Sequence, residues 1–236
     1  MSVCKTQAVP YGVTLIMAPW NYPFLLTLEP LAGLPLPAGN TVVIKPSAYA
    51  PASSAVLKQI CEEAFDPCLV TVVEGGRAEN EALLDECWDK IFFTGSVPVG
   101  KLVMERASKN LTPVTLELGG KSPCIVDATA NLKVAARRIA FGKWLNVGQT
   151  CVAPDYLLVD TSVRDELLGL IKEEVRRMFG EHPLDNEDYG HIVNAKHFAR
   201  VRGLIDPDKV VLGGAAREAS LKIEPTILDG VTPDDA

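Results

Sequence analysis

The segment Asn146–Val152, which reads NVGQTCV, places a cysteine just after a glycine-containing turn with polar neighbours. A thiolate nucleophile needs exposed hydrogen-bond donors and a backbone that lets its substrate approach closely, so Cys151 is a candidate for nucleophilic catalysis. An isolated cysteine is more often an inert, partly buried small side chain. On this segment alone, both interpretations of Cys151 stay open.

A carboxylate and an amide are the next candidates. Glu117 lies near the end of the apolar run 114–118, just before Gly119–Gly120, where an apolar wall would favour a general base. A surface glutamate beside a hairpin-like turn would have no such role. Asn21 follows another apolar run, and its side chain can either donate to an oxyanion or cap the next helix.

Two further segments are suited to an anionic ligand. Lys45 ends a third apolar run, and residues 93–100 (FTGSVPVG) lead from a strand through glycine into the start of a helix. The free N–H groups and the dipole at such a helix start favour an anion such as a pyrophosphate. The segment lacks the GxGxxG pattern, so its spacing alone is a weak signal.

The elements that must position these residues alternate between strand and helix. We predict strands over 11–17, 41–44, 69–73 and 90–93, and helices over 22–34, 52–64, 79–86 and 99–109. Apolar strands that alternate with helices are typical of a parallel sheet covered on both faces. We therefore predict an α/β fold with a doubly wound, mainly parallel sheet, whose carboxyl edge carries Asn21 and Lys45.

A second α/β region is expected from residue 118 onward. Strand-like runs cover 114–118 and 123–126, helical patterns cover 132–145 and 163–179, and further strand-like runs cover 206–214 and 223–228.

In the first region, the prolines at positions 35 and 37 do not suit a helix interior, so we expect the helix over 22–34 to end there.

Composition excludes several classes of protein. The 236 residues carry a net charge of -7, which argues against nucleic acid or an anionic membrane as the main partner. No apolar run reaches the ~20 residues of a transmembrane helix, and the first residues lack the pattern of a signal peptide. We therefore expect a cytoplasmic protein with reduced thiols. No CxxC or HExxH motif is present, so we expect no metal site.

Five segments together resemble the aldehyde dehydrogenase superfamily, most closely its class 3, fatty-aldehyde branch. They are APWNYP at 18–23, AGNTVVIKPS at 38–47, FFTGSVPVGK at 92–101, LELGGKSP at 116–123 and NVGQTCVAPDY at 146–156. They occur in the family's order, and the similarity covers essentially the whole chain.

The resemblance implies an NAD(P)-binding domain over 1–117 and part of a catalytic domain over 118–236. The implied reaction oxidises an aldehyde to a carboxylic acid with NAD or NADP. Cys151 would form first a thiohemiacetal and then a thioester, Asn21 would stabilise the oxyanion, and Glu117 would activate the water that hydrolyses the thioester. The implied cofactor-binding residues are Trp20, Lys45, Ser47, Gly95, Ser96 and Gly100.

The chain also departs from the family's pattern. Relatives often carry a glutamate three residues after the lysine that binds the adenosine ribose, and here that position is Ala48. Losing this carboxylate removes repulsion against a 2′-phosphate, so we expect NADP to be accepted beside NAD. An alternative is that Ala48 simply lies in a solvated loop.

Family members are roughly twice as long and form homodimers. We therefore expect this chain to be a central fragment that lacks part of the dimer contact. The main alternative function is an inactive or nucleotide-binding-only fragment. A cysteine-dependent esterase or a coenzyme A-acylating enzyme is a further alternative, although an acylating enzyme would not need the base Glu117.

Overall fold

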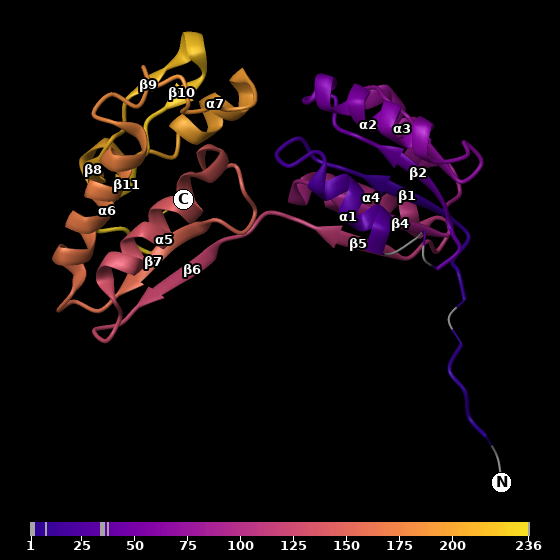
Figure 1. Ribbon diagram of the computed structural model, residues 1–236, viewed down its shortest axis with the longest axis horizontal. Helices are drawn as coiled ribbons and strands as arrows, with labels where there is room; N and C mark the ends of the chain where they lie inside the picture. The colour runs from indigo at the N-terminus through magenta and orange to yellow at the C-terminus, as the bar shows by residue number, and fades with distance from the viewer. Residues whose placement is uncertain (1–2, 8, 34–35, 37, 236) are drawn as a thin grey trace. The chain divides into compact units, whose positions relative to one another are not determined.

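The computed structural model describes residues 3–7, 9–33, 36 and 38–235. The chain forms two compact units, residues 1–119 and residues 120–236, which we call unit 1 and unit 2. Each unit has its own buried apolar clusters. In Figure 1, unit 1 runs from indigo to magenta and unit 2 from pink to yellow.

Unit 1 contains a parallel five-stranded sheet in the order β3-β2-β1-β4-β5. Its strands are β1 (Val13–Met17), β2 (Thr41–Lys45), β3 (Val70–Val72), β4 (Lys90–Thr94) and β5 (Val114–Glu117). Because the chain moves outward from β1 to β3 and then returns to β4 on the other side of β1, the helices must cover both faces.

Four helices connect these strands: α1 (Leu25–Gly33), α2 (Pro51–Ala64), α3 (Arg77–Asp85) and α4 (Val97–Ser108). Side chains of α1 and α2 pack with Ile16 on one face of the sheet. Side chains of α3 and α4 pack with Leu15 and Met17 on the other face. Successive residues of β1 thus point into different apolar layers, as a strand's two-residue period requires. The expected doubly wound parallel sheet is confirmed.

Element ends differ from the sequence-based ranges by a few residues. Helix α1 begins at Leu25 rather than at position 22, and it contains Pro30. The expected helix end at position 34 and the prolines at 35 and 37 lie outside the described residues. Helix α3 begins at Arg77, earlier than expected, because the Glu79 carboxylate accepts a hydrogen bond from the Gly76 N–H at 2.6 Å and caps the first turn.

Unit 2 begins with a β-α-β arrangement followed by a long helix. Its elements are β6 (Ser122–Val126), α5 (Leu132–Trp144), β7 (Pro154–Val159) and α6 (Arg164–Phe179). Strands β6 and β7 are parallel, so α5 is the crossover between them. Side chains of α5 and α6 pack with Val126 in one cluster, and Trp144 belongs to this core.

Strand β7 is an element that the sequence analysis missed. Its exposed Tyr156 and Leu158 pair with Pro123 and Ile125, so apolar residues occur on both faces of the strand and the usual alternation is absent. The runs on either side of Gly119 were expected to flank a turn. They instead enter different sheets, since β5 pairs with β4 and β6 pairs with β7.

The rest of unit 2 forms short elements around a small apolar cluster of Ile192, Phe198 and Ile223. The elements are a 3-10 turn η1 (Leu145–Gly148), helix α7 (Ala195–Arg202), and strands β8 (Val210–Leu212), β9 (Ala216–Arg217), β10 (Lys222–Ile223) and β11 (Ile227–Leu228). Strands β8 and β11 pair antiparallel, as do β9 and β10. The Tyr189 hydroxyl donates to the Ile223 carbonyl at 2.8 Å and ties this region together.

We predict that Leu167→Ala lowers the free energy of unfolding of unit 2 by about 2–5 kcal/mol. Leu167 is 1% exposed within the α5–α6 core, so truncation removes buried methyl groups and leaves a cavity. Urea denaturation measures the loss. Leu204→Ala is the matched control, because Leu204 is 43% exposed and its truncation should cost less than ~0.5 kcal/mol. Equal losses in the two variants would contradict this account of the core.

Candidate functional site

The carboxyl edge of the parallel sheet in unit 1 gathers several of the expected site residues. Lys45 is the last residue of β2, and its carbonyl accepts a hydrogen bond from the Ala18 N–H at 3.0 Å. Glu117 is the last residue of β5, and its carbonyl accepts one from the Gly95 N–H at 2.9 Å. The segments that follow β1, β2, β4 and β5 therefore begin at one level of the sheet.

The strand order also reverses at this edge, between β1 and β4. Strands β1 and β4 are neighbours, but α1 leaves β1 on one face and α4 leaves β4 on the other. Ligands of open α/β sheets bind outside the strand ends at such a reversal of strand order. Trp20 and Asn21 follow β1 there, and Gly95 and Ser96 follow β4.

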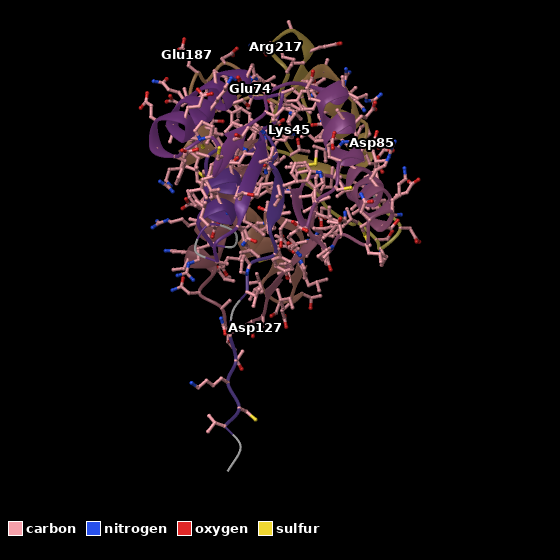
Figure 2. All side chains as sticks on the ribbon, turned by 90° about the vertical axis from the view of Figure 1, so that its right-hand side faces the viewer. Lys45, Glu74, Asp85, Asp127, Glu187 and Arg217 are labelled. Atoms are coloured by element: carbon pink, nitrogen blue, oxygen red, sulfur yellow. The ribbon has the colours of Figure 1, made fainter. Side chains whose placement is uncertain are left out.

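Lys45 is held inside unit 1 by the backbone (Figure 2). It is 2% exposed, and its ammonium donates to the Pro46 carbonyl at 2.7 Å and to the Gly75 carbonyl at 2.6 Å. An ammonium has three N–H donors, so these bonds use two of them. Burial lowers the pKa of Lys45, and the charges of Glu79 and Glu74 partly oppose that shift.

Glu79 couples the helix start to this lysine. Backbone hydrogen bonds, chiefly those of the α3 cap, lower the pKa of Glu79, and the nearby Lys45 charge acts in the same direction. The carboxylate therefore stays ionised at neutral pH and keeps a negative charge near the buried ammonium. No sequence motif pointed to Glu79, although a glutamate at the third position of a helix is a known capping signal.

Ser47 and Ala48 lie in the turn between β2 and α2. The Ser47 carbonyl accepts hydrogen bonds from the Ala50 N–H at 3.2 Å and from the Ser54 hydroxyl at 2.9 Å. The Ser47 hydroxyl accepts one from the Tyr49 N–H at 3.2 Å. Ala48 is exposed in this turn, so a longer side chain fits there without disturbing the core.

The end of β4 offers groups suited to a nucleotide. The buried Thr94 hydroxyl has no hydrogen-bond partner among the described residues. Ser96 is the N-cap of α4, and its side chain makes no capping hydrogen bond in the described chain. An unpartnered hydroxyl beside a helix N-terminus is compatible with a phosphate-bearing cofactor.

The two glycines of this segment have packing reasons of their own. A Cβ on Gly95 would come within 2.6 Å of the Phe93 ring. Gly100 is buried within α4, where a Cβ would come within 2.8 Å of Leu118. Glycine at position 100 therefore lets α4 pack closely against the segment that follows β5.

Asn21 and Glu117, the expected oxyanion donor and base, differ in exposure. Asn21 is half-buried, and its Oδ1 atom is fully buried. The Glu117 residue is exposed at the end of β5. Both follow strands of unit 1, whereas the expected nucleophile, Cys151, belongs to unit 2.

The loop before Cys151 has an unusual backbone. Asn146, Val147 and Gly148 have consecutive positive φ angles of 52°, 58° and 76°. Glycine adopts this region readily, but a β-branched residue such as valine does so at a cost of about 1–3 kcal/mol. Surrounding contacts must hold Val147 in this conformation. Cys151 itself is half-buried.

Those contacts come from the segment 190–193 and the small cluster beside it. The Val147 side chain packs against the cluster of Ile192, Phe198 and Ile223. It also lies so close to Gly190 that a Cβ there would be 3.0 Å from Val147 Cγ2. The strained residue is thus anchored by burial of its own side chain.

The Gln149 side chain adds polar contacts between this loop and the segment 190–193. Its Oε1 accepts a hydrogen bond from the Val193 N–H at 3.0 Å. Its Nε2 donates to the Asn146 carbonyl at 3.1 Å and to the His191 carbonyl at 3.2 Å. The sequence analysis gave Gln149 no role, because nothing in the local pattern indicates a partner more than forty residues away.

Gly120 lies against the loop that contains Cys151. A Cβ on Gly120 would come within 2.4 Å of the Cys151 carbonyl oxygen. Because this neighbour is backbone, it has no flexible side-chain end that could move away. The second glycine of the segment LELGGKSP is therefore required for this close approach, and it connects that segment to the loop of Cys151.

Other parts of the described chain show no competing site chemistry. A cavity of about 200 Å³ lies toward the amino ends of the strands, where it is lined by residues that include Tyr11, Asn40 and Lys90. No three His, Cys, Asp or Glu side chains gather as a metal-binding group in the described ranges. None of the helices described here has the length and apolar character needed to cross a membrane.

Comparison with known proteins gives the family. The model of the aldehyde dehydrogenase family matches residues 1–236. Aldehyde dehydrogenase family 3 member H1 of Arabidopsis thaliana is 49% identical over 230 residues, which are 95% of this chain and 47% of the relative. The dimeric NADP-preferring aldehyde dehydrogenase of Rattus norvegicus is 49% identical over 224 residues, 95% of this chain and 49% of the relative.

Solved structures agree with the sequence comparisons. The substrate-bound AldH of Staphylococcus aureus has a TM-score of 0.90 and 50% identity, and the match covers 97% of this chain and 50% of that one. A mutant aldehyde dehydrogenase C of Pseudomonas syringae with NAD+ and octanal has a TM-score of 0.86 and 30% identity, covering 96% and 49%. This chain thus spans about half the length of these relatives. It belongs to the aldehyde dehydrogenase family, with class 3 members among its similar relatives.

Proposed function

We propose that the protein of which these residues form part oxidises an aldehyde to a carboxylic acid with NAD or NADP. The observation that carries the proposal is the family match over residues 1–236, which includes Asn21, Glu117 and Cys151. The packing of Gly120 against the Cys151 carbonyl supports the proposal. Gly120 follows the proposed base, Glu117, by three residues, so the segment of the base is connected to the loop of the proposed nucleophile.

In the proposed mechanism, Cys151 attacks the aldehyde carbon. Its Sγ carries the substrate first as a thiohemiacetal and then as a thioester. The Asn21 side-chain amide and the Cys151 backbone N–H donate hydrogen bonds to the oxyanion. Glu117 takes a proton from the water that hydrolyses the thioester and so releases the acid.

NAD or NADP, when bound, supplies the two-electron acceptor for this oxidation. Lys45 offers its remaining N–H donor to the adenosine ribose, with Ser47 beside it. Ser96 and the start of α4 are suited to the pyrophosphate, between the packing glycines Gly95 and Gly100. Trp20 follows β1 on the other side of the reversal in strand order.

Relatives indicate the range of cofactors and substrates. One is named for its preference for NADP and its dimeric state, and another was solved with NAD+ and octanal. By extension, we propose that this protein acts on an apolar aldehyde of medium chain length or longer. It would accept either NAD or NADP, and it would form a homodimer. Because the chain spans half of its relatives, a nucleotide-binding or inactive fragment is the second candidate for the 236 residues alone.

Replacing the nucleophile provides the first test. We predict that Cys151→Ala abolishes formation of NAD(P)H from a medium-chain aldehyde, because no other group in the mechanism forms the covalent adduct. The assay compares the 236-residue chain with a longer version that carries the rest of the family sequence, each with and without the substitution. Activity that survives Cys151→Ala would end the nucleophile assignment, whereas activity in the longer version alone would favour the fragment alternative.

The role of Glu117 can be separated from that of Cys151. In the active version, Glu117→Gln should slow steady-state turnover by about 10²- to 10⁴-fold, the usual contribution of a general base. A rapid initial burst of NAD(P)H should remain, because oxidation precedes hydrolysis of the thioester. Stopped-flow absorbance measures both phases. Unchanged turnover would exclude Glu117 as the base, and rescue by coenzyme A alone would favour an acylating enzyme.

Position 48 tests the choice of cofactor. We predict that Ala48→Glu raises the ratio of kcat/KM for NAD to that for NADP by tenfold or more, on the order of 1.4 kcal/mol, because a carboxylate repels a 2′-phosphate. Ala48→Gln is the uncharged control and should change the ratio much less. An unsubstituted enzyme that already prefers NAD by over roughly a hundredfold, ~2.7 kcal/mol, would contradict the role given to Ala48.

A further inference from the structure

The side chain of Gln149 joins two segments that are distant in the sequence of unit 2. It accepts a hydrogen bond from the Val193 N–H and donates to the carbonyls of Asn146 and His191. All three partners are backbone groups, so the amide fixes main-chain positions on both sides. We call this arrangement the Gln149 bracket.

The bracket acts where the backbone is under strain. Val147 has a φ angle of 58°, and it lies between Asn146, whose carbonyl the amide binds, and Gln149 itself. The Gln149 N–H also donates to the Asn146 carbonyl at 3.1 Å, which closes the same turn from the main chain. The side-chain amide therefore adds to the packing of Val147 and to this main-chain hydrogen bond in holding the loop against its conformational cost.

We propose that Gln149 is a positioning residue, whose bracket fixes the backbone of the loop that carries Cys151. Cys151 lies two residues after Gln149, and Gly120 packs against its carbonyl. The loop is therefore held at Gln149 by the segment 190–193 and at Cys151 by Gly120. The role of Cys151 as nucleophile rests on the proposed function, whereas the bracket itself does not.

Two substitutions distinguish the acceptor contact of the Gln149 side chain from its two donor contacts. Gln149→Met keeps the length of the side chain and removes all of its hydrogen bonds. Gln149→Glu keeps an acceptor for the Val193 N–H, but it loses the donors to Asn146 and His191 and places a carboxylate against two carbonyls. Gln59→Met is the matched control, because the Gln59 amide lies on the exposed face of α2 and donates only to Glu63 among the interactions described.

The first readout is amide hydrogen exchange of the unliganded 236-residue chain. In Gln149→Met, exchange of the Val193 N–H and of residues 145–153 should become about tenfold faster, the effect of losing one or two hydrogen bonds. In Gln149→Glu, the Val193 N–H should stay protected while the loop still exchanges faster. Exchange in α6 should be unchanged. Exchange in Gln149→Met that matches the unsubstituted chain would overturn the proposal.

The second readout is alkylation of individual thiols by iodoacetamide, followed by mass spectrometry. Cys151 should react roughly threefold faster or more in both Gln149 variants, because it is half-buried and a looser loop exposes it. Cys124, in β6 of the same unit, and the buried Cys61 report general unfolding. An equal increase at Cys124 would show that Gln149 only stabilises the unit, and would overturn its positioning role.

Neither readout requires an aldehyde or a nicotinamide. If the longer version fails to oxidise aldehydes while the 236-residue chain shows the expected exchange and alkylation, the proposed function is contradicted and the bracket stays supported. If Gln149→Met unfolds unit 2, the exchange of α6 reveals it, and Gln149→Glu then supplies the comparison between the loop and the Val193 N–H. Equal exchange of these two sites in Gln149→Glu would also overturn the proposal.

Discussion

Parallel pairing of five strands is the constraint on which the rest of unit 1 depends. Because every strand runs in the same direction, all connections that begin at strand ends begin at one edge, and the hydrogen bonds from Ala18 to Lys45 and from Gly95 to Glu117 keep these ends level. A lysine, a glutamate and a helix N-terminus that are distant in the sequence therefore share one side of the sheet. The shared position of these groups follows from the sheet topology and not from a local sequence motif.

In unit 2, tertiary contacts hold the short loop before Cys151 in an unfavourable backbone conformation. Burial of Val147, the side-chain hydrogen bonds of Gln149 and the close approach of Gly120 act within residues 146–151. The contacts come from the segment 190–193 and its neighbouring apolar cluster, from the loop itself and from Gly120. In unit 1, side chains at the sheet edge are positioned by regular structure, whereas in unit 2 the loop is positioned by specific tertiary contacts.

The sequence predicted the regular parts of this arrangement well, since strand–helix alternation indicates a parallel sheet before any coordinates are known. Strand β7 was missed because Tyr156 and Leu158 leave apolar residues on its exposed face and remove the expected alternation. The family resemblance pointed to Cys151 as the expected nucleophile, but Gln149 acts through backbone groups of residues 191 and 193. Residue types do not reveal such partners, so this role became visible only in three dimensions. Glu79 also binds a backbone group, and its place in the first turn of a helix is the one sequence signal that indicates its role.

The left-handed backbone of Val147 has a consequence for the response of the loop to cooling and to urea. Its conformational cost is offset by burial among Ile192, Phe198 and Ile223, which is an apolar contribution, and by an amide, which is a polar one. The stabilisation from apolar burial weakens on cooling and in urea. The conformation of the loop therefore depends on the packing of a cluster that contains none of the proposed catalytic residues. Conditions that weaken this cluster therefore also weaken the packing that holds the loop before Cys151.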